Sequence, residues 1–229
     1  MTTFVLVHGS WLGGWAWARV APALRASGHT VLCPSLTPAE PGVGLRTHIA
    51  EIVGLIDRDD LSDVILVGHS YGGMVITGAG QERPLRVRQL VYLDAFFPSP
   101  GQSAFGLHPV LRDACDAAAA AALRPEQDAW LIPPFGFETM GLTAADLKWV
   151  RARARPMSRA THEEPLPNPV SRRPRPPATY IWCGESPFFA GTAKTARRRG
   201  ARLLTVAGAT HMAPVTDPER VCAVLGRTG

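Results

Sequence analysis

The chain has only four cysteines among its 229 residues, and no two of them form a C-x-x-C pair. Cys33, Cys115, Cys183 and Cys222 are scattered, and Cys33 and Cys183 lie in or beside apolar runs, where a reduced cysteine behaves as a small hydrophobic residue. This spacing argues against a disulfide framework and against a cysteine-ligated metal. We therefore expect no metal site and no cofactor.

Long apolar runs are also missing. No stretch reaches the roughly 18–20 residues that a membrane-spanning helix requires. The first three residues lead directly into an apolar strand, without a basic region or a small-residue cleavage site, so no secretory signal is expected. We predict a cytoplasmic protein that does not act at a membrane.

Lysine is scarce, since only Lys148 and Lys194 occur, and arginine therefore supplies nearly all the positive charge behind the net charge of +5. Arg197–Arg199 close a predicted helix before Gly200, where positive charge complements the helix dipole. Other arginines alternate with prolines between residues 151 and 175. No nucleic-acid-binding motif accompanies these arginines, and we expect no nucleic-acid partner.

What the sequence does contain is an alternation of short apolar strands and helical segments. Nearly continuous apolar strands of four or five residues are typical of parallel strands buried on both faces. The strands are predicted at 3–7, 30–33, 64–67, 89–93, 179–183 and 202–206. Helices are predicted at 15–26, 47–57, 71–80 and, with Asp217 as the capping residue, up to residue 225. We expect an α/β fold with a mostly parallel sheet of about six strands and helices on both faces.

One interval interrupts this alternation. More than eighty residues separate Leu93 from Thr179 without a clear buried strand. The interval holds an alanine-rich helix at 114–123, an aromatic and proline stretch at 130–137, a helix at 143–155 and a proline-rich run at 165–177. We interpret 96–177 as a short cap inserted before the penultimate strand, between two parts of one core at 1–95 and 178–229.

The strongest chemical motif is Gly68-His69-Ser70-Tyr71-Gly72, which follows a predicted strand and precedes a predicted helix. A G-x-S-x-G sequence in this context places the serine on a sharp, strained strand-to-helix turn, with its hydroxyl exposed above the sheet. The flanking glycines are needed because a Cβ atom there would collide with nearby backbone. Ser70 is therefore the candidate nucleophile.

A serine hydroxyl needs a base to take its proton. His211, in a loop after the last strand, is the candidate, because His69 is held inside the turn and would point away from the hydroxyl. The acid that orients the base must lie between Ser70 and His211 in this chain order. Asp94, at the end of its strand, is favoured, and Glu185 is the alternative.

Two backbone N–H groups are needed to stabilise an oxyanion. We expect one from Tyr71, directly after the nucleophile, and the other from Ser10 in the glycine-rich loop after the first strand. His8 precedes this loop, and we interpret it as a structural, hydrogen-bonded histidine.

The segments 4–17 and 26–31 resemble the opening of the plant methylesterase and hydroxynitrile lyase group of α/β-hydrolases, and the likeness extends over most of the chain outside the inserted segment. The resemblance implies an α/β-hydrolase fold. Lyase members of the group carry threonine after the first-strand histidine and lysine after the catalytic histidine, where this chain has Gly9 and Met212, so esterase chemistry is favoured. The group's acidic residue falls at or beside Ser186, where this chain has no aspartate.

These observations predict a serine hydrolase that cleaves a small, apolar or aromatic carboxylic ester or lactone through an acyl-enzyme. A lyase or cyclase using the same serine and histidine is one alternative, and a ligand-binding receptor is another. The protein is expected to be a monomer or a homodimer. The side chains expected to line the substrate pocket, together with Ser10, are those of Trp11, Tyr71, Phe96, Phe97, Trp130 and Met212.

Overall fold

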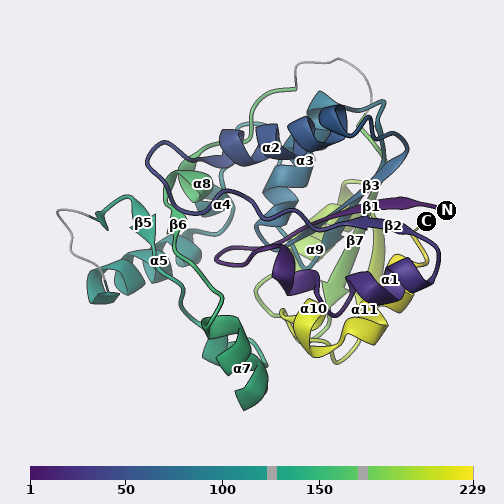
Figure 1. Ribbon diagram of the computed structural model, residues 1–229. Coiled ribbons are helices and arrows are strands. Elements are labelled where there is room, and N and C mark those ends of the chain that lie inside the picture. The colour runs from purple at the N-terminus through teal and green to yellow at the C-terminus, as the bar shows by residue number, and fades with distance from the viewer. Residues whose placement is uncertain (123–127, 170–174, 229) are drawn as a thin grey trace.

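The computed structural model describes residues 1–122, 128–169 and 175–228 (Figure 1). Its main sheet has six parallel strands in the order β2-β1-β3-β4-β7-β8. The strands are β1 (Thr3–Val7), β2 (Thr30–Leu32), β3 (Val64–His69), β4 (Val87–Leu93), β7 (Ala178–Cys183) and β8 (Arg202–Val206). All six predicted strands are confirmed, and each end lies within two residues of its prediction.

Alternate side chains of the strands enter two separate apolar layers, which explains why the central strands are apolar on both faces. Phe4 and Leu6 pack in the layer under α1 (Ala21–Ala26) and α11 (Pro218–Leu225). Val5 and Val7 pack in the opposite layer, under α2 (Leu45–Arg58), α3 (Gly72–Glu82) and α9 (Ala190–Arg198). Figure 1 shows α1 and α11 together on one side of the sheet and α2 and α3 on the other.

The helix predicted at 15–26 is wrong as a single element. The chain instead forms a short 3-10 helix, η1 (Gly14–Trp17), and then α1. Pro22 lies in the first turn of α1, where its missing N–H costs nothing, but in the interior of a longer helix it would lose a hydrogen bond and clash with the preceding turn. Asp217 takes the predicted N-cap position of α11, with Pro218 in the first turn, but its carboxylate pairs with Arg220 and accepts no hydrogen bond from that turn.

Within the described residues, the interval between β4 and β7 contains seven short elements. They are α4 (Ala104–Leu107), α5 (Pro109–Ala122), β5 (Leu131–Ile132), η2 (Phe137–Thr139), α7 (Ala144–Arg151), β6 (Met157–Ser158) and α8 (Ala160–Glu163). β5 and β6 pair antiparallel, a ribbon that the sequence did not predict, because two-residue strands have no periodicity. Leu123 and residues 170–174, parts of the predicted alanine-rich helix and proline-rich run, lie outside the described residues.

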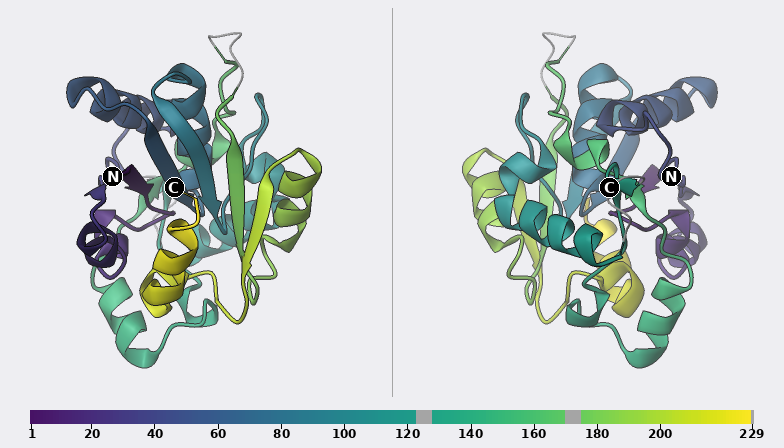
Figure 2. Two further views of the ribbon diagram at one scale, coloured as in Figure 1. Left: turned by 90° about the vertical axis from the view of Figure 1, so that its right-hand side faces the viewer. Right: turned by 90° about the vertical axis from the view of Figure 1, so that its left-hand side faces the viewer.

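The inserted segment lies on the opposite side of the molecule from the two chain termini (Figures 1 and 2). Its residues meet the loops that follow the parallel strands, which is where open α/β sheets bind ligands. All four cysteines are free. Among the described residues, no helix is both long and apolar enough to cross a bilayer.

Candidate active site

Ser70 lies on the tight turn between β3 and α3. Its φ angle of 54° is in the left-handed region, which a residue with a side chain rarely adopts. A Cβ atom on Gly68 would come within 2.6 Å of the Gly72 carbonyl carbon, and one on Gly72 within 2.6 Å of the Val7 carbonyl oxygen. Both glycines are therefore required by close backbone contacts, and the turn holds Ser70 in a strained conformation at the carboxyl end of the sheet.

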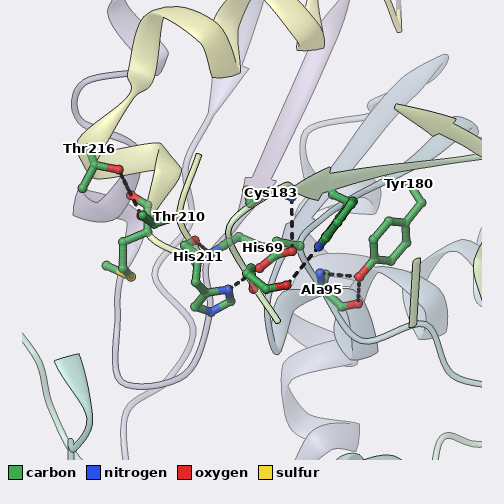
Figure 3. Close-up of polar contacts among 11 residues, drawn as sticks. His69, Ala95, Tyr180, Cys183, Thr210, His211 and Thr216 are labelled. Carbon is green, nitrogen blue, oxygen red and sulfur yellow. Dashed lines mark hydrogen bonds and ion pairs between the residues drawn. The ribbon is translucent and has the colours of Figure 1, made fainter. Parts of the chain in front are cut away.

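His211 follows β8, and its Nδ1 lies 2.7 Å from Oδ2 of Asp94 (Figure 3). Because an ionised carboxylate only accepts hydrogen bonds, this contact puts the imidazole proton on Nδ1 and leaves Nε2 as an acceptor. His211 and Ser70 lie on the wall of the same cavity. Within the described residues no hydrogen bond joins the two side chains, and catalytic hydrogen bonds often tighten only when substrate binds.

Asp94 follows β4 directly, and its side chain is 0% exposed. Its φ angle is 44°, a left-handed conformation that aspartate tolerates better than most residues. Besides His211, the Cys183 N–H donates to Oδ1 at 3.3 Å from the neighbouring strand β7. A buried carboxylate needs such partners, and both of these come from segments more than eighty residues further along the chain.

His69 contacts the loop that carries His211 and holds it by a hydrogen bond. Its Nε2–H donates to the His211 carbonyl oxygen at 2.8 Å, and the two rings lie 4.7 Å apart (Figure 3). Burial lowers the pKa of His69 well below its usual value, so the ring stays neutral. His69 thus contacts the backbone of His211 and makes no hydrogen bond to Ser70 within the described part of the chain.

Glu185, the alternative acid, is exposed at the edge of the cavity. Its backbone N–H donates to the Ala209 carbonyl and so ties the loop after β7 to the loop that carries His211. Among the described residues its carboxylate makes no hydrogen bond or ion pair. Ser186, where the resembled group has its acid, is buried and also lines the cavity.

The two expected oxyanion donors are both available. Within the described residues neither the Ser10 N–H nor the Tyr71 N–H donates a hydrogen bond. The Leu12 N–H donates to the Gly9 carbonyl at 3.3 Å and closes a turn in which Trp11 has a φ of 63°. A Cβ atom on Gly9 would lie 2.8 Å from Cβ of Ser70, so this loop passes directly beside the nucleophile.

A cavity of about 470 Å³ opens beside Ser70 and His211. Of the side chains predicted to line it, those of Ser10, Trp11 and Phe96 do so. Met212 instead closes a niche of about 20 Å³ that Ser70 and His211 also line.

Three other predicted pocket residues lie elsewhere. The Tyr71 ring turns away from this cavity, and its hydroxyl lies 2.9 Å from Nδ1 of His48. Phe97 packs against Tyr92, and neither Phe97 nor Trp130 lines the cavity in the described structure. The Trp130 backbone instead accepts a hydrogen bond from the Arg159 N–H.

Several aromatic and apolar residues of the cavity wall were not predicted. Phe189 stacks against the His211 ring at 5.4 Å, and Phe188 stacks against His108 at 4.4 Å. The two adjacent phenylalanines lie in the loop after β7, and this pair is a sequence feature that could have identified them. Leu111, Phe135 and Met140, which were also not predicted, come from the inserted segment.

In the part of the chain that the structure describes, no three histidine, cysteine, aspartate or glutamate side chains converge as a metal site requires. The absence of a cofactor stays a prediction.

His8 is buried between two backbone groups, as its structural interpretation predicts. Its Nδ1–H donates to the Gly9 carbonyl at 2.9 Å, and its Nε2 accepts from the Leu36 N–H at 3.0 Å. Only a neutral ring makes both bonds. Burial lowers its pKa to about 4, and burial also lowers the pKa values of His48, His69 and His162.

We expect these buried histidines to make the fold sensitive to acid. Below pH 6.5 the unfolded chain binds protons that the folded chain does not, so the free energy of unfolding falls as the pH falls. His8 alone should lower it by about 2 kcal/mol between pH 7.5 and pH 5.0. Urea unfolding at pH 7.5, 6.0 and 5.0 measures this. His8→Asn should show a weaker pH dependence, and equal stability of the parent protein at all three values would contradict the prediction.

The chain matches the Alpha/beta hydrolase family over residues 4–224. It is 43% identical to a carbendazim hydrolyzing esterase of Nocardioides over 183 residues, which cover 72% of this chain and 73% of that protein. It is 32% identical to an alpha-hydroxynitrile lyase of Arabidopsis thaliana over 107 residues, 42% of this chain and 40% of that protein.

Methylesterases of Arabidopsis thaliana are similar to it as well. An extracellular alpha/beta-hydrolase of a Paenibacillus species superposes with a TM-score of 0.81 at 25% identity, covering 100% of this chain and 99% of that one. The match over nearly the whole sequence, the parallel sheet and the serine turn agree, and the chain therefore belongs to the alpha/beta hydrolase family.

Proposed function

We propose that the protein is a serine esterase whose nucleophile is Ser70, whose base is His211 and whose acid is Asp94. The observation that carries the proposal is the 2.7 Å contact between buried Asp94 and Nδ1 of His211, a ring that shares a cavity with the strained Ser70. The esterases among its relatives support the same activity. The cytoplasmic location and the absence of a role at membranes stay predictions.

The reaction follows from the proton positions. His211 Nε2 takes the Ser70 proton as Oγ attacks the carbonyl carbon, and the Asp94 carboxylate stabilises the imidazolium that forms. The oxyanion is held by the N–H groups of Ser10 and Tyr71. His211 then protonates the departing alkoxide, and a water molecule, activated by the same Nε2, hydrolyses the acyl-enzyme.

The substrate we propose is a small, uncharged ester or lactone with an apolar or aromatic group. A cavity of about 470 Å³ is of the size that suits such molecules. Its wall is largely apolar, with Phe96, Phe135 and Phe189 among the lining residues, and Glu185 is the one acidic or basic side chain among the described lining residues apart from the neutral catalytic imidazole. That carboxylate would repel an anionic substrate.

The experiment that tests the proposal is a panel of aryl esters, methyl esters, lactones and thioesters, assayed with the parent protein and Ser70→Ala. A fluorophosphonate probe, which reacts with activated serines, should label the parent protein and not the variant. Failure of every ester, together with no labelling of Ser70, would refute the esterase proposal, and tight binding of a small ligand without turnover would favour a receptor.

A lyase is the second candidate, because an alpha-hydroxynitrile lyase is among the relatives. A lyase that uses His211 only as a base forms no acyl-enzyme, so Ser70→Ala should then keep appreciable turnover. The buried Met212 beside His211 weighs against it, because a thioether cannot offer the positive charge that a departing cyanide needs.

A further inference from the structure

A histidine of the inserted segment reaches the loop beside the nucleophile. Nε2 of His162, on α8, lies 3.0 Å from the Ser10 hydroxyl, although 152 positions separate the two residues. The His162 side chain is fully buried. The contact joins the inserted segment to the residue whose backbone N–H is one of the two proposed oxyanion donors.

The direction of this hydrogen bond follows from its neighbours. The Thr161 hydroxyl donates to the Ser158 carbonyl at 2.6 Å, so its oxygen is left to accept from His162 Nδ1–H at 2.9 Å. Nε2 of His162 therefore has no proton and accepts from the Ser10 hydroxyl. Burial lowers the pKa of His162 to about 3, so the ring remains a neutral acceptor at any ordinary pH.

The same ring also contacts the second oxyanion residue. His162 stacks on the Tyr71 ring, with centroids 5.0 Å apart and planes 16° from parallel. The Tyr71 hydroxyl donates to Nδ1 of His48, whose Nε2–H donates to the Thr37 carbonyl at 3.0 Å, so the tyrosine ring is fixed from its other end. One imidazole thus touches the side chains of both residues that offer the oxyanion their N–H groups.

The loop after β1 needs such support because its turn is strained. Trp11, the residue after Ser10, has a φ of 63°, a conformation that is costly for a residue with a large side chain. Two more hydrogen bonds to the inserted segment hold Trp11. The Trp11 Nε1–H donates to the Ile132 carbonyl at 3.2 Å, and the Trp11 carbonyl accepts from the Arg155 N–H at 3.0 Å.

We propose that His162 is a positioning residue that sets the spacing of the Ser10 and Tyr71 N–H groups through its hydrogen bond to one side chain and its stacking on the other. This inference rests on the proposed esterase function. The negative charge develops in the transition state leading to the tetrahedral intermediate and is absent from the bound ester, so a displaced donor lowers kcat and leaves substrate binding nearly unchanged. The inserted segment would then contribute to catalysis as well as to the cavity wall.

The test uses the best ester found in the substrate panel. His162→Phe keeps a flat ring against Tyr71 but cannot accept from Ser10, and it should lower kcat roughly 10- to 100-fold with KM changed less than about twofold. His162→Gln, which can place a carbonyl oxygen near Nε2, should recover most of kcat. Ser10→Ala should lower kcat to a similar extent, and combining it with His162→Phe should cause little further loss.

His29→Phe is the matched control, because His29 lies before β2 at the other end of the sheet, and its kcat should equal that of the parent. A kcat that is unchanged in both His162→Phe and Ser10→Ala would overturn the inference, as would a loss confined to KM. Should His162→Phe not fold, the test uses Ser10→Ala, His162→Gln and their double variant instead. Parent turnover that does not depend on Ser70 would overturn the esterase proposal and this inference together.

Discussion

Replacing Ser70 by alanine is expected to lower kcat for ester hydrolysis by roughly 10⁴-fold or more. The variant loses the atom that attacks the carbonyl, so water would have to react directly, without an acyl-enzyme. The N–H groups of Ser10 and Tyr71 remain, and substrate binding should therefore change little. Steady-state kinetics on the best ester, with active-site titration of the parent protein, measures the effect.

The fold should survive this change. Ser70 is strained at a φ of 54°, and alanine must adopt the same angle, so the turn itself is unaltered. Ser27→Ala, a serine-to-alanine change at the exposed end of α1, is the control and should keep full activity. Turnover of Ser70→Ala within tenfold of the parent would contradict nucleophilic catalysis by Ser70 and favour a mechanism that uses His211 only as a base.

The sheet could be predicted from sequence because its central strands, such as β1 and β3, are buried on both faces and almost entirely apolar. Phe4 and Val5, for example, point into opposite layers, and residues 4–7 are apolar at every position. The helix at 15–26 failed for a local reason. Its apolar spacing is helical, but Pro22 starts a new helix, and periodicity alone does not register that break.

The site was predictable where local backbone geometry carries the signal. The turn at Ser70 requires glycine at positions 68 and 72, and both glycines lie within the same five-residue motif as the serine. The cavity wall was harder, because Phe135 and Leu111 reach it from an inserted segment whose path depends on contacts such as the pairing of β5 with β6. Trp130 was expected to line the cavity only because it is aromatic, and aromatic character does not determine where a side chain points.

The contact between His162 and Ser10 lay beyond prediction for the same reason. It joins residues 152 positions apart, and His162 belongs to no motif in the sequence. Asp94 is an intermediate case. Its place at the end of β4 suggested a buried carboxylate, yet the choice between it and Glu185 needed the position of β8, which carries the histidine loop to it.

Asp94→Asn is expected to lower kcat by about 10³- to 10⁴-fold. The Cys183 N–H would keep an amide oxygen as its acceptor, and the amide NH₂ group would then face Nδ1 of His211. Two donors cannot face each other, so Nδ1 must give up its proton and the ring must carry it on Nε2. A ring protonated on Nε2 cannot accept the proton of Ser70.

Glu185→Gln is the matched control, since it makes the same chemical change in the exposed carboxylate. It should alter kcat less than about threefold, because an exposed charge is screened by solvent. The free energy of unfolding of Asp94→Asn should stay near that of the parent, since the variant no longer buries a carboxylate charge, and urea unfolding checks this. The reverse pattern, with Glu185→Gln inactive and Asp94→Asn active, would transfer the role of acid to Glu185 and require the loop after β7 to move toward His211 when substrate binds.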